Sequence, residues 1–159
     1  MATRTRPITT DALAADVWRV LATFGLSQIQ RGPHLAILRR LGLTPGDLKV
    51  LAILDPDEPR PMRALADALS VDPSMATWFV DRLEEKGLVE RRPAPSDRRV
   101  KRVVLTPRGL RTRQRLLAAL FEPPPELLQL DRERLEALRS ALEHLPVPAS
   151  PFDGQRRAG

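Results

Sequence analysis

The residues best suited to chemistry in this sequence are arginines of one short, proline-containing loop. Residues 90–99 have the sequence E-R-R-P-A-P-S-D-R-R, which places Arg91, Arg92, Arg98 and Arg99 around the loop acid Asp97. Like charges this close repel one another and contribute nothing to folding, so they indicate an anionic partner outside the chain. The two prolines restrict the loop and lower the cost of ordering it against such a partner.

The positive charge of the chain is concentrated around this loop. The net charge is +6, and residues 60–115 carry 14 Lys and Arg against 7 Asp and Glu. A central basic block between nearly neutral flanks is typical of a nucleic-acid-binding surface. The alternative is a solvated face that only keeps the chain soluble. Arg60 and Arg63 lie in this block and are candidate contacts to a DNA backbone.

Other kinds of chemistry find little support in the composition. There is no cysteine, and the two histidines, His34 and His144, lie in unrelated contexts, so we expect no catalytic residues, no metal site and no cofactor. No apolar run approaches the roughly 18 residues of a membrane span, and the first residues lack the apolar segment of a signal peptide. We therefore expect a cytoplasmic protein that is not an enzyme and does not contact membranes.

Helical periodicity dominates the chain on both sides of the loop. Capping residues, prolines and glycines predict a helix from Thr10 interrupted at Gly25, and further helices at 34–41, after Thr44, at 61–69, at 73–86, after Thr106 and after Asp131. The segments 88–92 and 99–105 have the β-branched or alternating pattern of a two-stranded hairpin. Only a few residues separate 61–69 from 73–86, which is the spacing of a helix-turn-helix.

A helix-turn-helix followed directly by a basic hairpin predicts a winged helix. The expected fold class is mainly α (α+β), with a two-stranded β wing and additional N- and C-terminal helices. The leucine-rich outer helices either pack within the subunit or form a helical dimer interface, and the pattern leaves both open.

Several ordered motifs resemble the MarR family, the multiple-antibiotic-resistance-type regulators. They are G-L-T-P at 42–45, A-L-A-D-A-L-S-V-D-P-S at 64–74, V-D-R-L-E-E-K-G-L-V at 80–89, and the wing G-L-V-E-R-R-P-A-P-S-D-R-R-V-K-R-V-V-L-T-P-R-G at 87–109. The resemblance implies a homodimer, held by N- and C-terminal dimerisation helices, that binds double-stranded DNA at a pseudo-palindromic operator, usually as a repressor. The implied organisation is an arm and dimerisation helices in 1–42, a DNA-binding lobe in 43–106, C-terminal dimerisation helices in 107–145 and a flexible tail in 146–159.

The resemblance also assigns roles within the wing. The family's Asp-x-Arg pattern falls on Asp97 and Arg99, which implies that Arg99 enters the minor groove while Asp97 holds the wing in position. A planar, weakly hydrated guanidinium suits a narrow groove with concentrated negative potential. The remaining wing cations are candidate phosphate contacts: Arg91, Arg92, Arg98, Lys101 and Arg102.

The helix at 73–86 is the predicted recognition helix. Helical spacing turns Ala76, Phe79, Val80 and Leu83 inward and leaves Ser74, Met75, Thr77, Trp78 and Arg82 as candidate DNA contacts. We expect Asp81 to pair with Arg82 or a helix end. Trp78 departs from the family, which commonly has a polar residue there; it either contacts a thymine methyl, packs on the DNA backbone or covers the base of the hairpin.

The family resemblance further implies a cleft for a small aromatic or anionic effector between the dimer helices and the DNA lobe. Candidates from the first helices combine aromatic surface with a polar group, and they are Trp18, Phe24, Arg31, His34 and Leu38. The competing interpretation of the whole chain is a winged helix that coats DNA without sequence preference or binds another protein.

Overall fold

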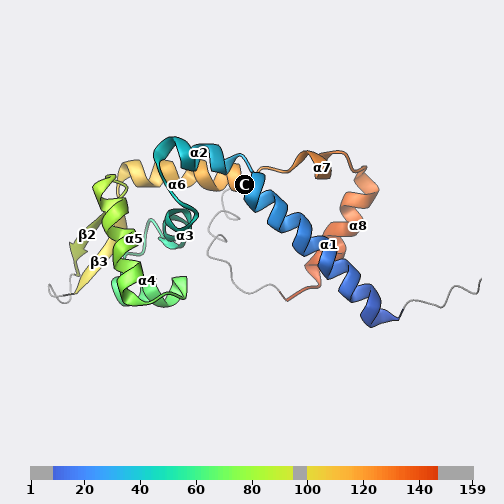
Figure 1. Ribbon diagram of the computed structural model, residues 1–159, viewed down its shortest axis with the longest axis horizontal. Helices are drawn as coiled ribbons and strands as arrows, with labels where there is room; N and C mark the ends of the chain where they lie inside the picture. Colours follow the sequence, from blue (N-terminus) through green and yellow to red (C-terminus); the bar gives the residue numbers. More distant parts are fainter. Residues whose placement is uncertain (1–8, 95–99, 147–159) are drawn as a thin grey trace, which may run out of the picture.

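The computed structural model describes residues 9–94 and 100–146, and it confirms a mainly helical fold with a small sheet (Figure 1). Its elements are α1 (Thr10–Arg31), α2 (His34–Leu41), α3 (Pro45–Ile53), β1 (Arg60–Pro61), α4 (Met62–Leu69), α5 (Pro73–Glu85), β2 (Val89–Pro93), β3 (Lys101–Leu105), α6 (Pro107–Leu120), α7 (Pro125–Leu128) and α8 (Arg132–Glu143). The bend at residues 70–72 between α4 and α5 makes the predicted helix-turn-helix, and β2 and β3 form the wing that follows it.

The hydrophobic core lies in the winged-helix lobe, which we define as residues 34–120. Fully buried side chains from α3, α4, α5, β3 and α6 meet there, among them Leu51, Leu65, Val80, Val103 and Leu116. Helix α6, predicted as part of the dimerisation helices, therefore contributes to this core along part of its length. The division of the chain at residue 106 stays a prediction.

The sheet has one more strand than the sequence predicted. Within the described residues its order is β1-β3-β2, all antiparallel, with Arg91 opposite Val103 and Arg60 opposite Val103 on the other side. The two-stranded prediction missed β1 because it has only two residues, too few to show alternation. One of them is Pro61, which is tolerated at the edge of a sheet.

Helix α1 continues through Gly25, contrary to the predicted interruption, and ends at Gly32. A glycine inside a helix costs only about 1 kcal/mol relative to alanine, which helical neighbours on both sides can offset. The short helix α7 was not predicted.

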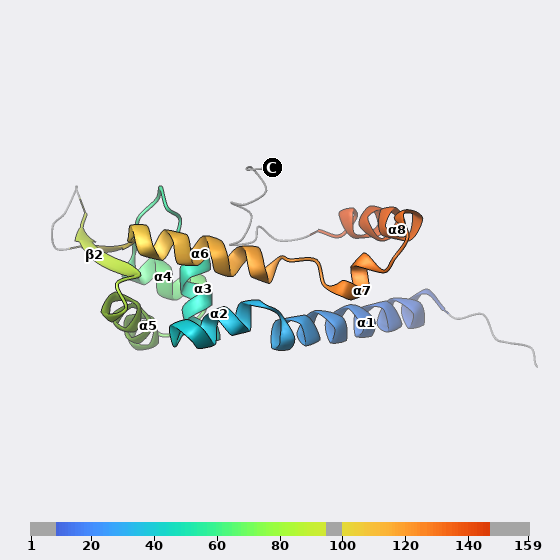
Figure 2. The ribbon, with the colours of Figure 1, turned by 90° about the horizontal axis from the view of Figure 1, so that it is seen from above.

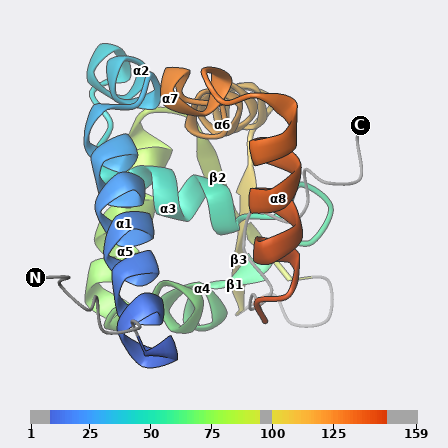
Figure 3. The ribbon, with the colours of Figure 1, turned by 90° about the vertical axis from the view of Figure 1, so that its right-hand side faces the viewer.

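Helices α1 and α8 extend away from the winged-helix lobe and lie apart from each other (Figures 2 and 3). In the part of the chain that the structure describes, no side chain of either helix is buried. Large apolar side chains are exposed on both: Leu13, Val17, Trp18, Val20, Leu26 and Ile29 on α1, and Leu135 and Leu142 on α8. Across residues 9–94 and 100–146, no helix has the length and apolar character needed to cross a membrane.

Candidate nucleic-acid interface

The start of α5, the predicted recognition helix, is fixed by its own capping residues. The carboxylate of Asp72 accepts hydrogen bonds from the backbone N–H groups of Ser74 and Met75, at 2.9 and 3.0 Å. The Ser74 hydroxyl donates to the same oxygen, and this bond, with those from the backbone, lowers the pKa of Asp72. Pro73 occupies the first helical position, as expected where no N–H is needed.

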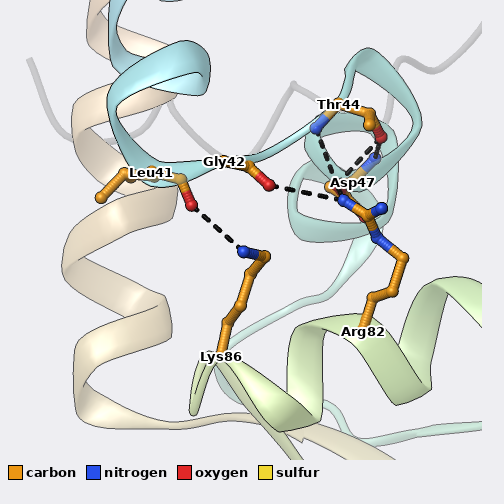
Figure 4. Close-up of polar contacts among 6 residues, drawn as sticks. All are labelled: Leu41, Gly42, Thr44, Asp47, Arg82 and Lys86. Carbon is orange, nitrogen blue, oxygen red and sulfur yellow. Dashed lines mark hydrogen bonds and ion pairs between the residues drawn. The ribbon is translucent and has the colours of Figure 1, made fainter.

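The middle of α5 is tied to the start of α3 through a buried carboxylate (Figure 4). Oδ2 of Asp47 accepts from the Thr44 backbone N–H at 2.7 Å, from the Thr44 hydroxyl at 2.9 Å and from the Arg82 guanidinium at 2.9 Å. Asp47 is completely buried, and the cation and the hydrogen-bond donors that offset its burial all contact Oδ2, while Oδ1 is buried without a hydrogen-bond partner among the described residues. Arg82, predicted as a DNA contact, is thus held within the fold.

A second contact joins the end of α5 to the end of α2. Nζ of Lys86 donates to the carbonyl of Leu41 at 3.3 Å, and Arg82 reaches the carbonyl of Gly42 at 3.4 Å (Figure 4). These carbonyls end α2, where Gly42 adopts a left-handed φ of 59°. Cations at a helix C-terminus are favourable because they satisfy free carbonyls and oppose the helix dipole.

The wing is attached to α5 through Arg91. Its guanidinium pairs with Asp81 at 2.5 Å and with Glu84, and its backbone N–H donates to Glu84 at 3.1 Å. The expectation that Asp81 pairs with Arg82 or a helix end is therefore wrong: Arg91 approaches Asp81 from β2, while Arg82 faces Asp47. Because Arg91 belongs to β2 and contacts two carboxylates of α5, it ties the wing to the predicted recognition helix.

The exposed face of α5 is more apolar than the sequence suggested. The Ser74 hydroxyl donates to Asp72, and the Thr77 hydroxyl donates to the carbonyl of Pro73 at 2.8 Å. Met75 and Trp78 are 42% and 48% exposed and, with Ser74, line an open hollow on the helix surface. The Trp78 ring lies beside Phe79 and Arg82, and the three predicted roles of Trp78, contact with a thymine methyl, with the DNA backbone or with the base of the hairpin, stay predictions.

The remaining predicted DNA contacts lie on the wing and on α4. Arg92 is exposed and pairs with Glu90, Lys101 is exposed at the start of β3, and Arg102 is half-buried one residue later. Arg63 is exposed on α4, and Arg60 is half-buried on β1. The other three predicted wing residues, Asp97, Arg98 and Arg99, lie outside the described residues.

The structure does not bring the five candidate effector residues together. Arg31 lines a cavity between the end of α1 and the end of α6, with Gln28, Leu120 and Pro124 among its other walls. Trp18 is 70% exposed and Phe24 is half-buried, both on α1. Leu38 is buried in the core of the winged-helix lobe, which gives it a packing role. A role of any of these residues in effector binding stays a prediction.

Two buried ionisable side chains shape this part of the molecule. His34 is buried at the start of α2, and desolvation lowers its pKa, opposed in part by a hydrogen bond with the backbone of Ile29. Arg113 of α6 donates to the carbonyls of Leu51 and Ala52 at 3.0 and 3.3 Å, at the end of α3. Burial lowers the pKa of Arg113, and the charge of Asp55 raises it. Among the described residues, no group of three or more His, Asp or Glu is arranged to hold a metal ion.

Sequence reasoning missed the tie between Asp47 and Arg82. The capping pattern of Thr44 and Asp47 is visible in the sequence, and it predicts the start of a helix. Nothing local shows that the same carboxylate pairs with an arginine 35 residues away.

Comparisons with known proteins agree with this geometry. Residues 43–101 match the family model described as the MarR family. The uncharacterized HTH-type transcriptional regulator YcgE of Bacillus subtilis is 38% identical over 104 residues, which cover 65% of this chain and 65% of YcgE. The chain therefore spans slightly less than two thirds of that relative's length. The HTH-type transcriptional repressor MdtR of Bacillus subtilis is 34% identical over 99 residues, 62% of this chain and 63% of MdtR.

A solved structure extends the similarity over most of the chain. The crystal structure of CouR from Rhodococcus jostii RHA1, bound to p-coumaroyl-CoA, has a TM-score of 0.56 and 26% identity. The match covers 89% of this chain and 100% of CouR. The winged-helix lobe and the flanking helices thus both have counterparts in a known protein.

Proposed function

We propose that the chain, whose residues 43–101 match the MarR family model, is a DNA-binding transcriptional regulator and acts as a sequence-specific repressor that binds a pseudo-palindromic operator as a homodimer. The relatives above are named as transcriptional regulators, which supports the prediction that the chain is not an enzyme. The similarity to MdtR, which is named as a repressor, supports repression over activation.

The observation that carries the proposal is the double attachment of the recognition helix. Asp47 holds Arg82 on one side of α5, and Arg91 holds Asp81 and Glu84 next to the wing. Helix and wing are therefore fixed relative to each other. A helix in the major groove and a wing at the neighbouring backbone or minor groove require such a fixed relation, because both must meet one duplex at once.

The outer helices support the homodimer. Helices α1 and α8 expose Leu13, Leu26, Leu135 and other large apolar side chains. Several large apolar side chains exposed on the same helices are expected where another protein surface covers them. A two-fold dimer through these helices supplies the symmetry that two operator half-sites demand.

The cavity beside Arg31 supports an effector of the predicted class. Its walls come from the ends of α1 and α6 and from α7, next to the exposed outer helices. The Arg31 guanidinium suits a carboxylate or phosphate, and prolines and Leu120 supply apolar surface. The similarity to CouR, whose structure contains an aromatic thioester of coenzyme A, is consistent with this chemistry.

An anisotropy titration tests the proposed function. The labelled probes are the duplex upstream of the chain's own gene and a scrambled duplex of equal composition, each at two salt concentrations. We expect the upstream duplex to bind ~10³-fold more tightly or better, as specific regulators do. Arg99→Ala should remove much of this preference. Equal affinity for both duplexes, with a steep salt dependence, would instead assign the alternative function of coating DNA without sequence preference.

A further inference from the structure

Internal hydrogen bonds occupy the polar side chains of the recognition helix. The hydroxyls of Ser74 and Thr77 donate to Asp72 and to the carbonyl of Pro73, and the charge of Arg82 is matched by Asp47. The two other predicted contacts, Met75 and Trp78, are apolar and exposed. They lie one turn apart on the same face of α5, so a duplex that meets this face meets thioether and indole surface first.

The indole of Trp78 is held in place from two sides. The ring of Phe79 lies edge-on to it, with centroids 5.2 Å apart and planes at 66°. The guanidinium carbon of Arg82 sits 4.8 Å from the Trp78 ring centroid, an attractive cation–π contact. Arg82 is itself fixed by Asp47 (Figure 4).

Phe79 is in turn held against α3. A Cβ atom added at Gly46 would lie 2.3 Å from Cε1 of Phe79, so α5 approaches α3 closely at this point. The chain from Asp47 through Arg82 to Trp78, with Phe79 behind it, therefore fixes an apolar side chain at the surface. Fixing it in advance lowers the entropy cost of contact with a partner.

We propose that Met75 and Trp78 recognise thymine C5-methyl groups in the major groove, with Asp47 and Arg82 as positioning residues. This inference rests on the proposed function and adds the chemistry of base recognition to it. The thymine methyl is the apolar group that a base pair presents in the major groove, and apolar side chains contact it. The residues that line the hollow belong to the basic block of residues 60–115, whose positive charge attracts a duplex.

Replacing thymine by uracil tests the proposal, because it removes the methyl group and leaves the base-pair hydrogen bonds unchanged. The protein first selects its preferred duplex from a randomised pool, and each thymine of that duplex is then replaced singly by uracil. At one or more positions in each half-site we expect the affinity to fall roughly fourfold, the value of one buried methyl group. In Trp78→Ala the same replacement should have no effect, although overall binding is weaker.

Three further variants make the result specific. Glu58→Ala changes an exposed residue of the turn between α3 and β1, away from α5, and should keep the full sensitivity to uracil. Arg82→Gln should lower the ratio of the affinity for the thymine duplex to the affinity for the uracil duplex. The substitution removes the cation beside the indole of Trp78 and, with it, the link from Trp78 to Asp47. Met75→Gln is a second test of the contact that applies even if Trp78→Ala does not fold.

The outcomes separate this inference from the proposed function. A selected duplex without a uracil-sensitive thymine, or equal sensitivity in Trp78→Ala, Met75→Gln and the unchanged protein, would overturn methyl recognition and leave sequence-specific binding intact. Enrichment of no duplex at all would contradict both.

Discussion

The carboxylate of Asp47 connects folding with recognition at the scale of a single residue. It closes a capping box with Thr44 at the start of α3, and it pairs with Arg82 on the recognition helix. A buried charge of this kind is stable only while its partners are present, since removing one leaves the other uncompensated. The same side chain therefore stabilises α3 and sets the position of α5.

Asp47→Ala should lower the free energy of unfolding by about 3 kcal/mol, because it removes both the cap and the partner of Arg82. Urea denaturation at one fixed protein concentration measures the change. Asp16→Ala is the matched control, since Asp16 pairs with Arg19 on the exposed surface of α1 and should contribute less than about 1 kcal/mol. Similar losses of unfolding free energy in the two variants would show that the buried pair stabilises the fold no more than the exposed pair does.

His34 should make stability depend on pH. Burial lowers the pKa of His34 below its usual 6.5, so the folded protein keeps the ring neutral while the unfolded chain takes up a proton. The contribution of His34 is complete above about pH 6.5 and is lost as the pH falls from there toward the lowered pKa. In His34→Gln, unfolding curves between pH 7 and pH 5 should show a smaller loss of stability than in the unchanged protein. His144→Gln, at an exposed position, should keep the full loss; equal slopes in all three proteins would refute the assignment.

At the scale of elements, most helix ends could be predicted because their signals are local. Thr44–Pro45, Asp72–Pro73 and Thr106–Pro107 each place a capping side chain before a proline, and the structure starts α3, α5 and α6 there. The strand β1 and the helix α7 were missed because two and four residues show no period. In the candidate site, the pairing of Arg91 with Asp81 and Glu84 could not be predicted, since it depends on how the wing folds back onto α5.

The junction of α6 with the turn before β2 provides a test at this scale. A Cβ atom at Gly109 would lie 1.7 Å from the carbonyl oxygen of Leu88, a backbone atom that cannot move aside alone. Gly109→Ala should therefore cost about 3 kcal/mol of unfolding free energy, the upper range for overpacking. At Gly25 the same substitution meets nothing within 4 Å, and Gly25→Ala should be neutral or stabilising by up to about 1 kcal/mol. Equal losses on urea denaturation would contradict the close approach at Gly109.

At the scale of the whole molecule, the outer helices α1 and α8 differ from the winged-helix lobe in how they bury apolar side chains. The winged-helix lobe buries its own core, whereas α1 and α8 show apolar side chains to solvent in the single chain. The leucine pattern in the sequence is compatible with packing within the subunit and with packing between subunits. The exposure of these leucines favours the second alternative, which the proposed homodimer adopts.

Substituting Leu135 and Leu142 by Asp should convert the dimer into monomers. In a two-fold dimer each substitution removes a buried leucine from both subunits at once. We therefore expect the dimerisation affinity to fall by roughly 100-fold or more. Sedimentation velocity over a range of concentrations measures the shift. Ala68→Asp, at an exposed position of α4, should leave the oligomeric state unchanged. An unaltered dimer in the leucine variant would place the interface elsewhere.

The most direct test of the whole account is a hydroxyl-radical footprint on the duplex upstream of the chain's own gene. A sequence-specific homodimer should protect two patches related by two-fold symmetry, with centres about 10 base pairs, or a multiple of that, apart. The protection should persist in the presence of excess scrambled duplex. Even protection along the whole fragment, removed by scrambled competitor, would contradict the central claim that this chain is an operator-specific regulator.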